Sequence, residues 1–384
     1  MSKKLKGAYI ARLDLDAPHL AGVSQKIRGQ MEALEEIPSE VELYYCSQGR
    51  IIRDGGVLAS YGPGALKRRF VHFVQFYRRV GSIIRGVDFV YIRYQGSSLW
   101  FLRMLSNIRR NNPGARIILE IPSWPYQTEA RTLREKFANL VDRITRPGLR
   151  GRVDRILTFS KEDTILGIPT VRTSNGVDVQ RLAVRAMPED YGLVRLVGVA
   201  NLSLWHGYDR VIAGLATYRR QPGAKQVRFD IVGSGAELER LKDQARRSGV
   251  DDIVVFHGTA TGEKLDAILV QSDIGISSLG MHRLDVDTSN LKSREYCARG
   301  IPFAIGYVDP DFPASLPFVF QVPANEDPVD IGALVAFHEA LKAEGPGIVL
   351  TMRNYAEREL TWKAKMRPAV ELITHHGRCQ EKRA

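Results

Sequence analysis

The sequence predicts an α/β protein built from two doubly wound, Rossmann-like domains. Short runs rich in β-branched and aromatic residues alternate with amphipathic helical runs along most of the 384 residues. This alternation is typical of βαβ units and of mainly parallel sheets. Strand candidates lie on both sides of a polar stretch at 180–193, which we interpret as a linker, and the length is sufficient for two domains with a core each.

The predicted strands of the first half are 8–12, 41–46, 89–94, 116–121 and 155–159. Those of the second half are 194–199, 228–232, 253–256, 274–277 and 303–305. Helical spacing fills most of the intervals, as at 23–36, and also the last segment at 352–374. We expect domains at 1–185 and 186–360, followed by a C-terminal helix and tail at 361–384.

Charge is distributed unevenly between the two halves. The net charge is +12, yet residues 1–185 hold 31 Lys and Arg against 17 Asp and Glu, whereas the remainder holds 24 against 26. The first half therefore carries the whole excess, which predicts an anionic partner for that half alone.

The cysteines and the N-terminus indicate a reducing compartment. Cys46, Cys297 and Cys379 are far apart and show no CxxC spacing, which argues against both a disulfide framework and a zinc site. The N-terminus shows no signal-peptide pattern, and no apolar run reaches the length of a membrane span. We expect a cytoplasmic protein.

The most informative motif runs from Asp287 to Glu295, two acidic residues separated by seven others, and leads into Gly300-Ile301-Pro302. The small and polar residues at 288–290 suit the start of a helix, whose free N–H groups favour anions. Glu295, about two turns into that helix, is then placed to reach a hydroxyl of the same ligand. This arrangement suggests a nucleotide-sugar diphosphate.

Further motifs stand at the ends of predicted strands, where open α/β sheets bind their ligands. In chain order they are Gly22-Val23-Ser24, Thr173-Ser174-Asn175-Gly176-Val177-Asp178, Gly233-Ser234-Gly235, Phe256-His257-Gly258 and Asp273. Together with the motif at 287–295 and Gly300-Ile301-Pro302, these make the chain resemble the retaining glycosyltransferases of family 4, which have the GT-B fold. The segments 120–126 and 205–210 resemble the bacterial branch that builds capsule, exopolysaccharide or lipopolysaccharide.

The resemblance implies two domains that face each other across a cleft, a C-terminal helix that returns to the first domain, an acceptor-binding first domain and a second domain for the nucleotide sugar. It implies that Glu295 binds ribose and that Asp287 contacts the donor sugar, with these two as the catalytic pair. It also implies a donor-binding set formed by Gly22, Asn201, His206, Gly233, Gly235, His257, Ser289, Asn290, Leu291, Lys292 and Glu295. Transfer would retain configuration without a protein nucleophile.

The chain departs from the family pattern at three positions. Asp287 replaces the usual Glu, Asn201 replaces an Arg, and His206 replaces a Lys that holds donor phosphates. A neutral amide and a titratable imidazole thus replace two permanent cations. Lys292, Arg283 and Arg294 are candidates for the missing charge.

An acceptor site and a membrane surface are expected in the first domain. Glu120 ends a predicted strand, and Trp124 and Tyr126 follow among prolines, so these three are the candidate acceptor ligands; the alternative is that the aromatic side chains pack as core. Residues 67–85 interleave basic clusters with aromatic side chains, which suits an anionic membrane interface or an ordinary core helix. A second basic set is Arg143, Arg146, Arg150 and Arg152.

No metal or other cofactor is expected, because the DxD matches at 14–16 and 285–287 and the terminal His375, His376 and Cys379 lack a supporting context. The protein is therefore predicted to be a peripheral, metal-independent transferase that uses an NDP-sugar and acts on a polysaccharide or lipid-linked oligosaccharide. The alternatives are a scaffold that binds a nucleotide sugar or a partner without turnover and a nucleotide-sugar epimerase. Nucleic-acid binding by the basic half is disfavoured, because no recognisable module is present and the second half is acidic.

Overall fold

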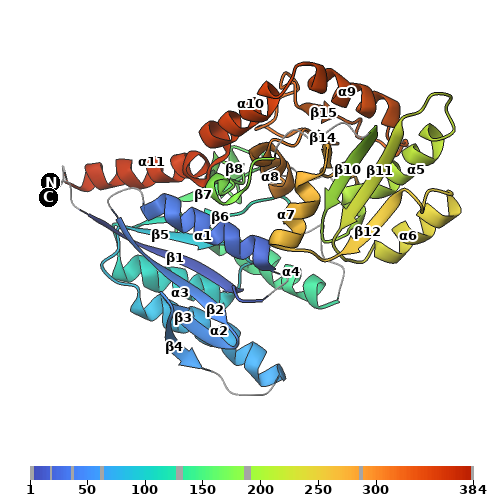
Figure 1. The fold of residues 1–384 in the computed structure, drawn as a ribbon. Coiled ribbons are helices and arrows are strands. Elements are labelled where there is room, and N and C mark those ends of the chain that lie inside the picture. Colours follow the sequence, from blue (N-terminus) through green and yellow to red (C-terminus); the bar gives the residue numbers. More distant parts are fainter. Residues whose placement is uncertain are drawn as a thin grey trace. The chain divides into compact units, whose positions relative to one another are not determined.

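The computed structural model describes residues 4–17, 20–35, 39–60, 65–126, 133–185, 192–284 and 289–381, and the side chains of residues 21, 65–72, 133–135 and 375–381 are outside this description. The chain divides into two compact units (Figure 1). Unit 1 comprises Met1–Ser174 and Trp362–Ala384, and unit 2 comprises Asn175–Thr361.

Unit 1 is built on a nine-stranded sheet of order β4-β3-β2-β1-β5-β6-β7-β9-β8. The strands are β1 (Leu5–Asp14), β2 (Ser39–Ser47), β3 (Arg50–Arg53), β4 (Gly56–Ser60), β5 (Phe89–Arg93), β6 (Arg116–Glu120), β7 (Arg155–Thr158), β8 (Thr164–Ile165) and β9 (Ile168–Arg172). The central strands are parallel, and β3, β4 and β8 pair antiparallel towards the two edges. The five strands predicted for this half are confirmed, whereas β3, β4, β8 and β9 are additions that the sequence pattern does not predict.

The helices of unit 1 are α1 (Ala21–Glu35), α2 (Ala65–Ile83), α3 (Leu99–Asn111), α4 (Leu133–Thr145), the 3-10 helix η3 (Arg146–Leu149) and α11 (Trp362–Glu381). The central strands are almost wholly buried, as expected for a parallel sheet covered on both faces. Ile92, Ile117 and Ile156 meet Phe76 and Met104 of the covering helices in one core.

The C-terminal helix α11 packs on unit 1, against α1, β6 and β9. The contact with α1 requires a glycine, because a Cβ on Gly29 would lie 2.0 Å from Cδ1 of Trp362. Near the crossing from unit 2, the Thr173 hydroxyl donates a hydrogen bond to the Lys365 carbonyl oxygen at 2.5 Å. The predicted return of this helix to the first domain is confirmed.

Unit 2 is a six-stranded parallel sheet of order β12-β11-β10-β13-β14-β15. The strands are β10 (Leu193–Val199), β11 (Gln226–Val232), β12 (Val254–Gly258), β13 (Ile274–Ile276), β14 (Phe303–Ile305) and β15 (Val319–Gln321). The helices are α5 (Tyr208–Tyr218), α6 (Leu238–Arg247), α7 (Glu263–Val270), α8 (Leu291–Arg299), α9 (Ile331–Ala343) and α10 (Gly347–Tyr355). Short helical turns are η4 (Val179–Arg181), η5 (Leu204–His206), η6 (Met281–Arg283) and η7 (Ala356–Leu360).

Both faces of the second sheet are covered. Along β10 and β11, Leu196 and Ile231 join one hydrophobic cluster, whereas their neighbours Val197 and Val232 join another. Successive side chains of a strand point to opposite faces, so the two clusters are the two sides of the sheet. This is the predicted doubly wound architecture.

Unit 2 begins before the predicted boundary at 185. Asn175 hydrogen-bonds to Ser289, Val177 forms a β-bridge with Thr361, and the buried Arg185 donates from Nε to the Gly300 carbonyl oxygen at 2.9 Å. The segment that the sequence assigns to the first domain is therefore held by unit 2 from Asn175 onward.

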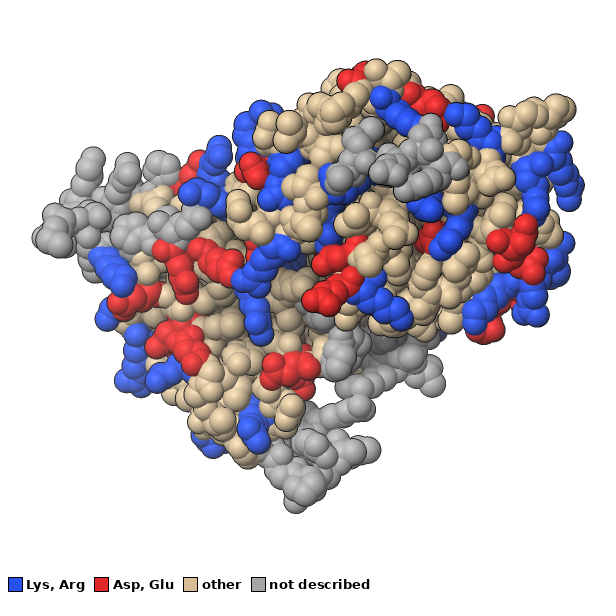
Figure 2. Space-filling model, viewed as in Figure 1, with Lys and Arg blue, Asp and Glu red and all other residues tan. Residues whose placement is uncertain are grey.

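None of the helices in the described ranges is long and apolar enough to cross a membrane. On the face that Figure 2 shows, basic side chains lie among acidic ones. The positive excess of the first half therefore does not form one continuous patch on the described part of that face.

A buried ion pair ties α1 to the end of β6. Lys26 Nζ lies 2.6 Å from Glu120 Oε1, and both side chains are almost fully buried. Arg93 Nη1 approaches the same oxygen at 3.4 Å. Burial lowers the pKa of Lys26 to about 8, against the opposing effect of Glu120.

We expect Lys26→Met to lower the free energy of unfolding by about 3 kcal/mol or more, because it leaves a buried carboxylate without its nearest cation. Urea unfolding followed by circular dichroism measures the change. The matched control is Lys4→Met, which breaks the exposed Lys4–Glu40 pair of similar length (2.9 Å) and should leave the midpoint unchanged. An equal effect of both variants would contradict this account.

Candidate functional site

The loops after β10, β11 and β12 form one frame at the carboxyl edge of the second sheet. The Ala200 amide donates to the Val232 carbonyl at 2.9 Å, and the Gly233 amide donates to the Gly258 carbonyl at 2.7 Å. The Leu202 amide donates to the Ser234 carbonyl at 2.8 Å. Backbone bonds thus join neighbouring loops, which gives this edge a defined shape.

Gly233 and Gly235 are required by this loop packing. Their φ angles are +135° and +155°, values that side chains rarely adopt. A Cβ at Gly233 would lie 1.8 Å from the Ala200 oxygen, and one at Gly235 would lie 2.3 Å from the Leu202 oxygen. The two glycines therefore position the loop backbone, and their contact with a donor stays a prediction.

The approach to α8 is fixed by buried hydrogen bonds. The Asn175 amide donates to Ser289 Oγ at 2.8 Å, and the Asn175 side chain donates to the Ser289 carbonyl. Asn290 follows as the residue that precedes α8, and Leu291 begins the helix. The motif at 173–178 and the start of the helix therefore meet, although they are more than one hundred residues apart in sequence. Asp287 lies outside the described residues, and its role stays a prediction.

Arg294 has a structural role. Its side chain is fully buried, with Nη2 2.7 Å from Asp309 Oδ1 and a second contact to Asp311. Its Nε donates to the Asn175 carbonyl at 3.3 Å. The suggestion that Arg294 supplies charge to a diphosphate is wrong, because two carboxylates already occupy the guanidinium.

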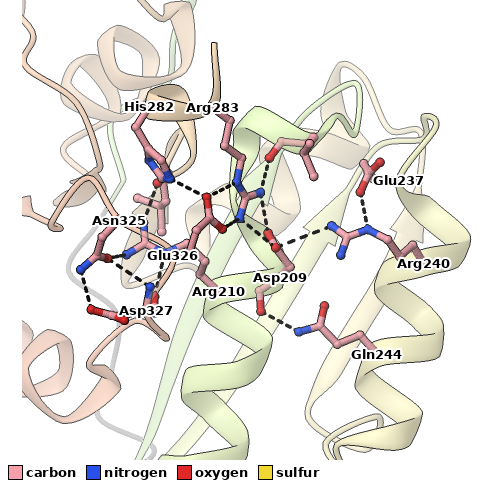
Figure 3. Close-up of polar contacts among 12 residues, drawn as sticks. Asp209, Arg210, Glu237, Arg240, Gln244, His282, Arg283, Asn325, Glu326 and Asp327 are labelled. Atoms are coloured by element: carbon pink, nitrogen blue, oxygen red, sulfur yellow. Dashed lines mark hydrogen bonds and ion pairs between the residues drawn. The ribbon is translucent and has the colours of Figure 1, made fainter. Parts of the chain in front are cut away.

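Arg283 is occupied in the same way (Figure 3). It lies 2.9 Å from Asp209 Oδ2 and 2.9 Å from Glu326 Oε1, and it donates to the Leu204 carbonyl at 2.6 Å. His282 adds a contact of 2.7 Å to Glu326. This cluster joins η6 to α5 and to the loop before α9, so the charge of Arg283 is already balanced by two carboxylates, and a contact with phosphate stays a prediction. No sequence signal points to Glu326, which is 43 residues from Arg283 in the chain.

Lys292 differs from these arginines. Its ammonium Nζ lies 3.3 Å from Ser278 Oγ and 5.7 Å from the centre of the Tyr208 ring. Burial alone lowers the pKa of Lys292 to about 7. No carboxylate of the described residues forms an ion pair with it. A half-buried lysine in the first turn of a helix, where the backbone N–H groups also favour anions, is suited to a negatively charged ligand.

His206 is buried, and its contact with a donor stays a prediction. It is 8% exposed, and its Nδ1 accepts a hydrogen bond from the Ser203 amide at 3.0 Å, which leaves the proton on Nε2. Burial, with a smaller effect of Lys292, lowers the pKa of His206 to about 2. The expectation of a titratable imidazole in place of the family's Lys is therefore wrong, because this ring stays uncharged at neutral pH.

Glu295 is half-buried on α8. Burial raises its pKa; Arg299 lowers it, and Asp266 raises it further.

Asn201 is exposed at the start of the loop after β10. His257 contacts Asp230 Oδ1 at 2.5 Å through Nε2, and Asp230 also accepts from Arg228 Nε at 3.0 Å. One ring nitrogen of His257 is thus occupied.

The predicted acceptor ligands pack into unit 1. Glu120 is fully buried in the pair with Lys26, so direct contact with an acceptor would require displacing that lysine. Tyr126 donates from its hydroxyl to the buried Asp142 at 2.5 Å, and its ring contacts Trp124 edge-on at 5.4 Å. The geometry of these three favours the core-packing alternative.

Gly22 lies in the first turn of α1, with no atom within 4 Å of a Cβ placed there. Its close approach to a diphosphate stays a prediction. In the described part of the chain, no group of three or more His, Cys, Asp or Glu side chains is arranged to hold a metal ion.

No family model and no curated protein matches the sequence. Solved structures do match over the full length. Sucrose-phosphate synthase from Thermosynechococcus elongatus has a TM-score of 0.64 at 15% identity and covers 99% of this chain and 100% of its own. A glycosyltransferase from Rickettsia africae has a TM-score of 0.63 at 14% identity, with coverages of 98% and 99%. Anabaena HepE, solved in complex with UDP, has a TM-score of 0.63 at 12% identity, with coverages of 97% and 100%. At such low identity the likeness shows the fold, and the fold is GT-B.

We expect Gly233→Ala to lower the free energy of unfolding by about 2 kcal/mol or more, since it adds a steric clash to a strained backbone conformation. The control is Gly223→Ala, at a φ of +73° with no atom within 4 Å of its Cβ, which measures the cost of a positive φ without a clash. Thermal unfolding compares the two. Equal losses would mean that contact with the Ala200 carbonyl has no energetic weight.

Proposed function

We propose that the protein is a glycosyltransferase that uses a nucleoside diphosphate sugar as its donor. It transfers one sugar, with retention of configuration, to a polysaccharide or lipid-linked oligosaccharide in bacterial surface glycan synthesis. The observation that carries the proposal is Lys292, a half-buried residue whose amine forms no ion pair with a described carboxylate and lies in the first turn of α8. The GT-B fold and the UDP and UDP-glucose complexes of Anabaena HepE support a nucleotide-sugar ligand.

In this proposal the donor diphosphate lies at the start of α8. The backbone N–H groups at 289–291 and the Lys292 ammonium hold its oxygens, and they stabilise the negative charge that grows on the diphosphate as the glycosidic bond breaks. Lys292 takes over the task of the two cations that Asn201 and His206 do not supply, so the diphosphate leaves without a metal ion. The loop glycines Gly233 and Gly235 bring backbone, instead of side chains, to the ligand.

Glu295 accepts hydrogen bonds from the ribose hydroxyls, and Asp287 contacts the donor sugar. Asn201 and His257 lie at the same edge of the sheet. The acceptor is bound by unit 1. Its hydroxyl attacks the anomeric carbon from the face that the diphosphate leaves and gives its proton to the departing diphosphate oxygen, so no protein nucleophile is required. A lipid-linked acceptor is held in the membrane, so the protein acts at the cytoplasmic face of that membrane.

A second candidate is a scaffold that binds a nucleotide sugar without turnover. The neutral Asn201 and the neutral, buried His206 favour it, because the family that the chain resembles has permanent cations at these two positions.

A panel of UDP-, GDP-, ADP- and dTDP-sugars separates the two candidates. We expect wild type to release nucleoside diphosphate from one donor, faster with a membrane lipid extract, and Glu295→Ala to lose this release. Binding of a donor without release from any of them would favour the scaffold. Absence of both would reject the assignment of the donor site.

Lys292→Met should weaken binding of the selected donor about tenfold or more, as expected for loss of a charged hydrogen-bond donor. Wild-type affinity should fall between pH 6 and pH 9: the free amine, with a pKa of about 7, loses its proton as pH rises, whereas the bound anion favours the protonated form. Calorimetric titration measures both effects. Lys292→Arg should bind without this pH dependence, and Lys242→Met on α6 should match wild type. A flat wild-type profile would contradict this role.

Glu295→Gln should raise the unfolding temperature near pH 7 while weakening donor binding. Because burial raises the pKa of this carboxyl, the folded state holds the proton more tightly than the unfolded state does, so this group lowers stability as pH rises past its unfolded pKa. Glutamine avoids that cost but loses the charged acceptor for ribose. Melting curves at pH 4 and pH 7 test the sign, and the stability gain should be confined to the higher pH.

A further inference from the structure

Helix α4 presents apolar side chains to solvent. Phe137 is 67% exposed, Leu140 is 53% exposed and Ile144 is 69% exposed. These positions are spaced by three and four residues, so they form one stripe along the helix. A stripe of this kind normally faces the core of its own domain.

The inward side of the same helix carries a carboxylate. Asp142 is 1% exposed and accepts hydrogen bonds from the Ser97 amide at 2.6 Å and from the hydroxyls of Tyr94 and Tyr126. These three donors fix the rotation of α4 on unit 1. Turning the apolar stripe inward would break all of them and would leave the buried Tyr94 hydroxyl and Ser97 amide without an acceptor, which is costly.

Basic side chains surround the stripe. Lys136 lies four residues before Leu140 and Arg143 three residues after it, so both neighbour it on the helix surface, and both are exposed. Arg150 is exposed at the end of η3. Among the described side chains between 136 and 150, the only acidic one is the buried Asp142. The surface is thus apolar and cationic together.

We propose that α4 and η3 are the surface through which the protein binds an anionic membrane interface, with Phe137, Leu140 and Ile144 among the acyl chains and the basic residues at the headgroups. Apolar side chains with adjacent Lys and Arg are the combination that holds a helix in such an interface. The membrane partner belongs to the proposed function, and the new element is the site that makes the contact.

This assignment differs from the helix that the sequence predicts. In α2, Phe76 and Tyr77 are buried in the core of unit 1, at 0% and 3% exposure. Arg78 and Arg79 are exposed, but the aromatic side chains beside them are taken up by packing. The side chains of residues 67–72 lie outside the described part of α2.

Co-sedimentation of the full chain with lipid vesicles tests the proposal without donor or acceptor. Wild type should bind vesicles of phosphatidylcholine with phosphatidylglycerol, bind phosphatidylcholine alone weakly, and lose affinity as salt rises. The double variant Phe137→Ser with Ile144→Ser should bind the anionic vesicles about tenfold or more weakly, since two large apolar side chains no longer enter the interface. Arg143→Glu should weaken binding to anionic vesicles alone.

The matched control is Leu350→Ser on α10 in unit 2, which removes an apolar side chain of similar exposure (64%) and should bind as wild type does. Circular dichroism checks that each variant is folded. Equal binding by the double variant and wild type would overturn the proposal, as would failure of wild type to bind anionic vesicles. Self-association that depends on Phe137 without vesicle binding would assign the surface to a second copy instead, which also overturns it.

Release of nucleoside diphosphate in the absence of vesicles separates this proposal from the proposed function. The double variant should release it at the wild-type rate, because none of its changes lies in unit 2. A wild type that binds vesicles but turns over no donor would reject the proposed function and leave the membrane surface standing.

Discussion

The buried cluster of Arg294 with Asp309 and Asp311 is the interaction on which the candidate site depends. A guanidinium without solvent is stable only when carboxylates and carbonyl oxygens satisfy it, and here Asn175 supplies one of those carbonyls. The cluster therefore does more than stabilise α8. It fixes the segment in which the chain enters unit 2 against the start of that helix, and so sets where the first N–H groups of α8 point.

The interpretation of Lys292 depends on that arrangement. The neighbouring cations Arg283 and Arg294 each lie between two carboxylates, whereas no described carboxylate forms an ion pair with Lys292. A protein that needed this amine only for stability would gain by pairing it or replacing it with an apolar residue. Retaining an amine whose charged form is costly is better explained by a ligand that completes the site, and an anion at the helix start is the ligand whose charge does so.

The sequence predicted the architecture well and the individual site residues less well. Periodicity revealed the buried parallel strands, because a strand covered on both faces is apolar along its whole length. Periodicity did not reveal the short antiparallel pairs at the edges of the first sheet, since β8, for example, spans only two residues. Spacing along a helix placed Arg294 near the ligand, but it could not show that Asp309 and Asp311 reach the same guanidinium from a later loop. The prediction of a titratable His206 was wrong for the same reason. The charge state of this ring is set by burial and by the Ser203 amide, which are properties of the folded chain.

The two basic helices of unit 1 show this limit most directly. α2 and α4 have similar compositions, with aromatic or aliphatic side chains interleaved with Lys and Arg. The sequence alone favours α2 as the helix that contacts the membrane. The outcome is decided by what each helix meets: α2 finds an apolar partner in α3, through Tyr77 and Phe101, whereas α4 meets the hydroxyls of Tyr94 and Tyr126. Those hydroxyls require an acceptor, Asp142 provides it, and the helix must then turn its apolar side chains outward. The exposed stripe is thus a consequence of satisfying buried polar groups, and it leaves an apolar, positively charged surface that an anionic membrane would complement.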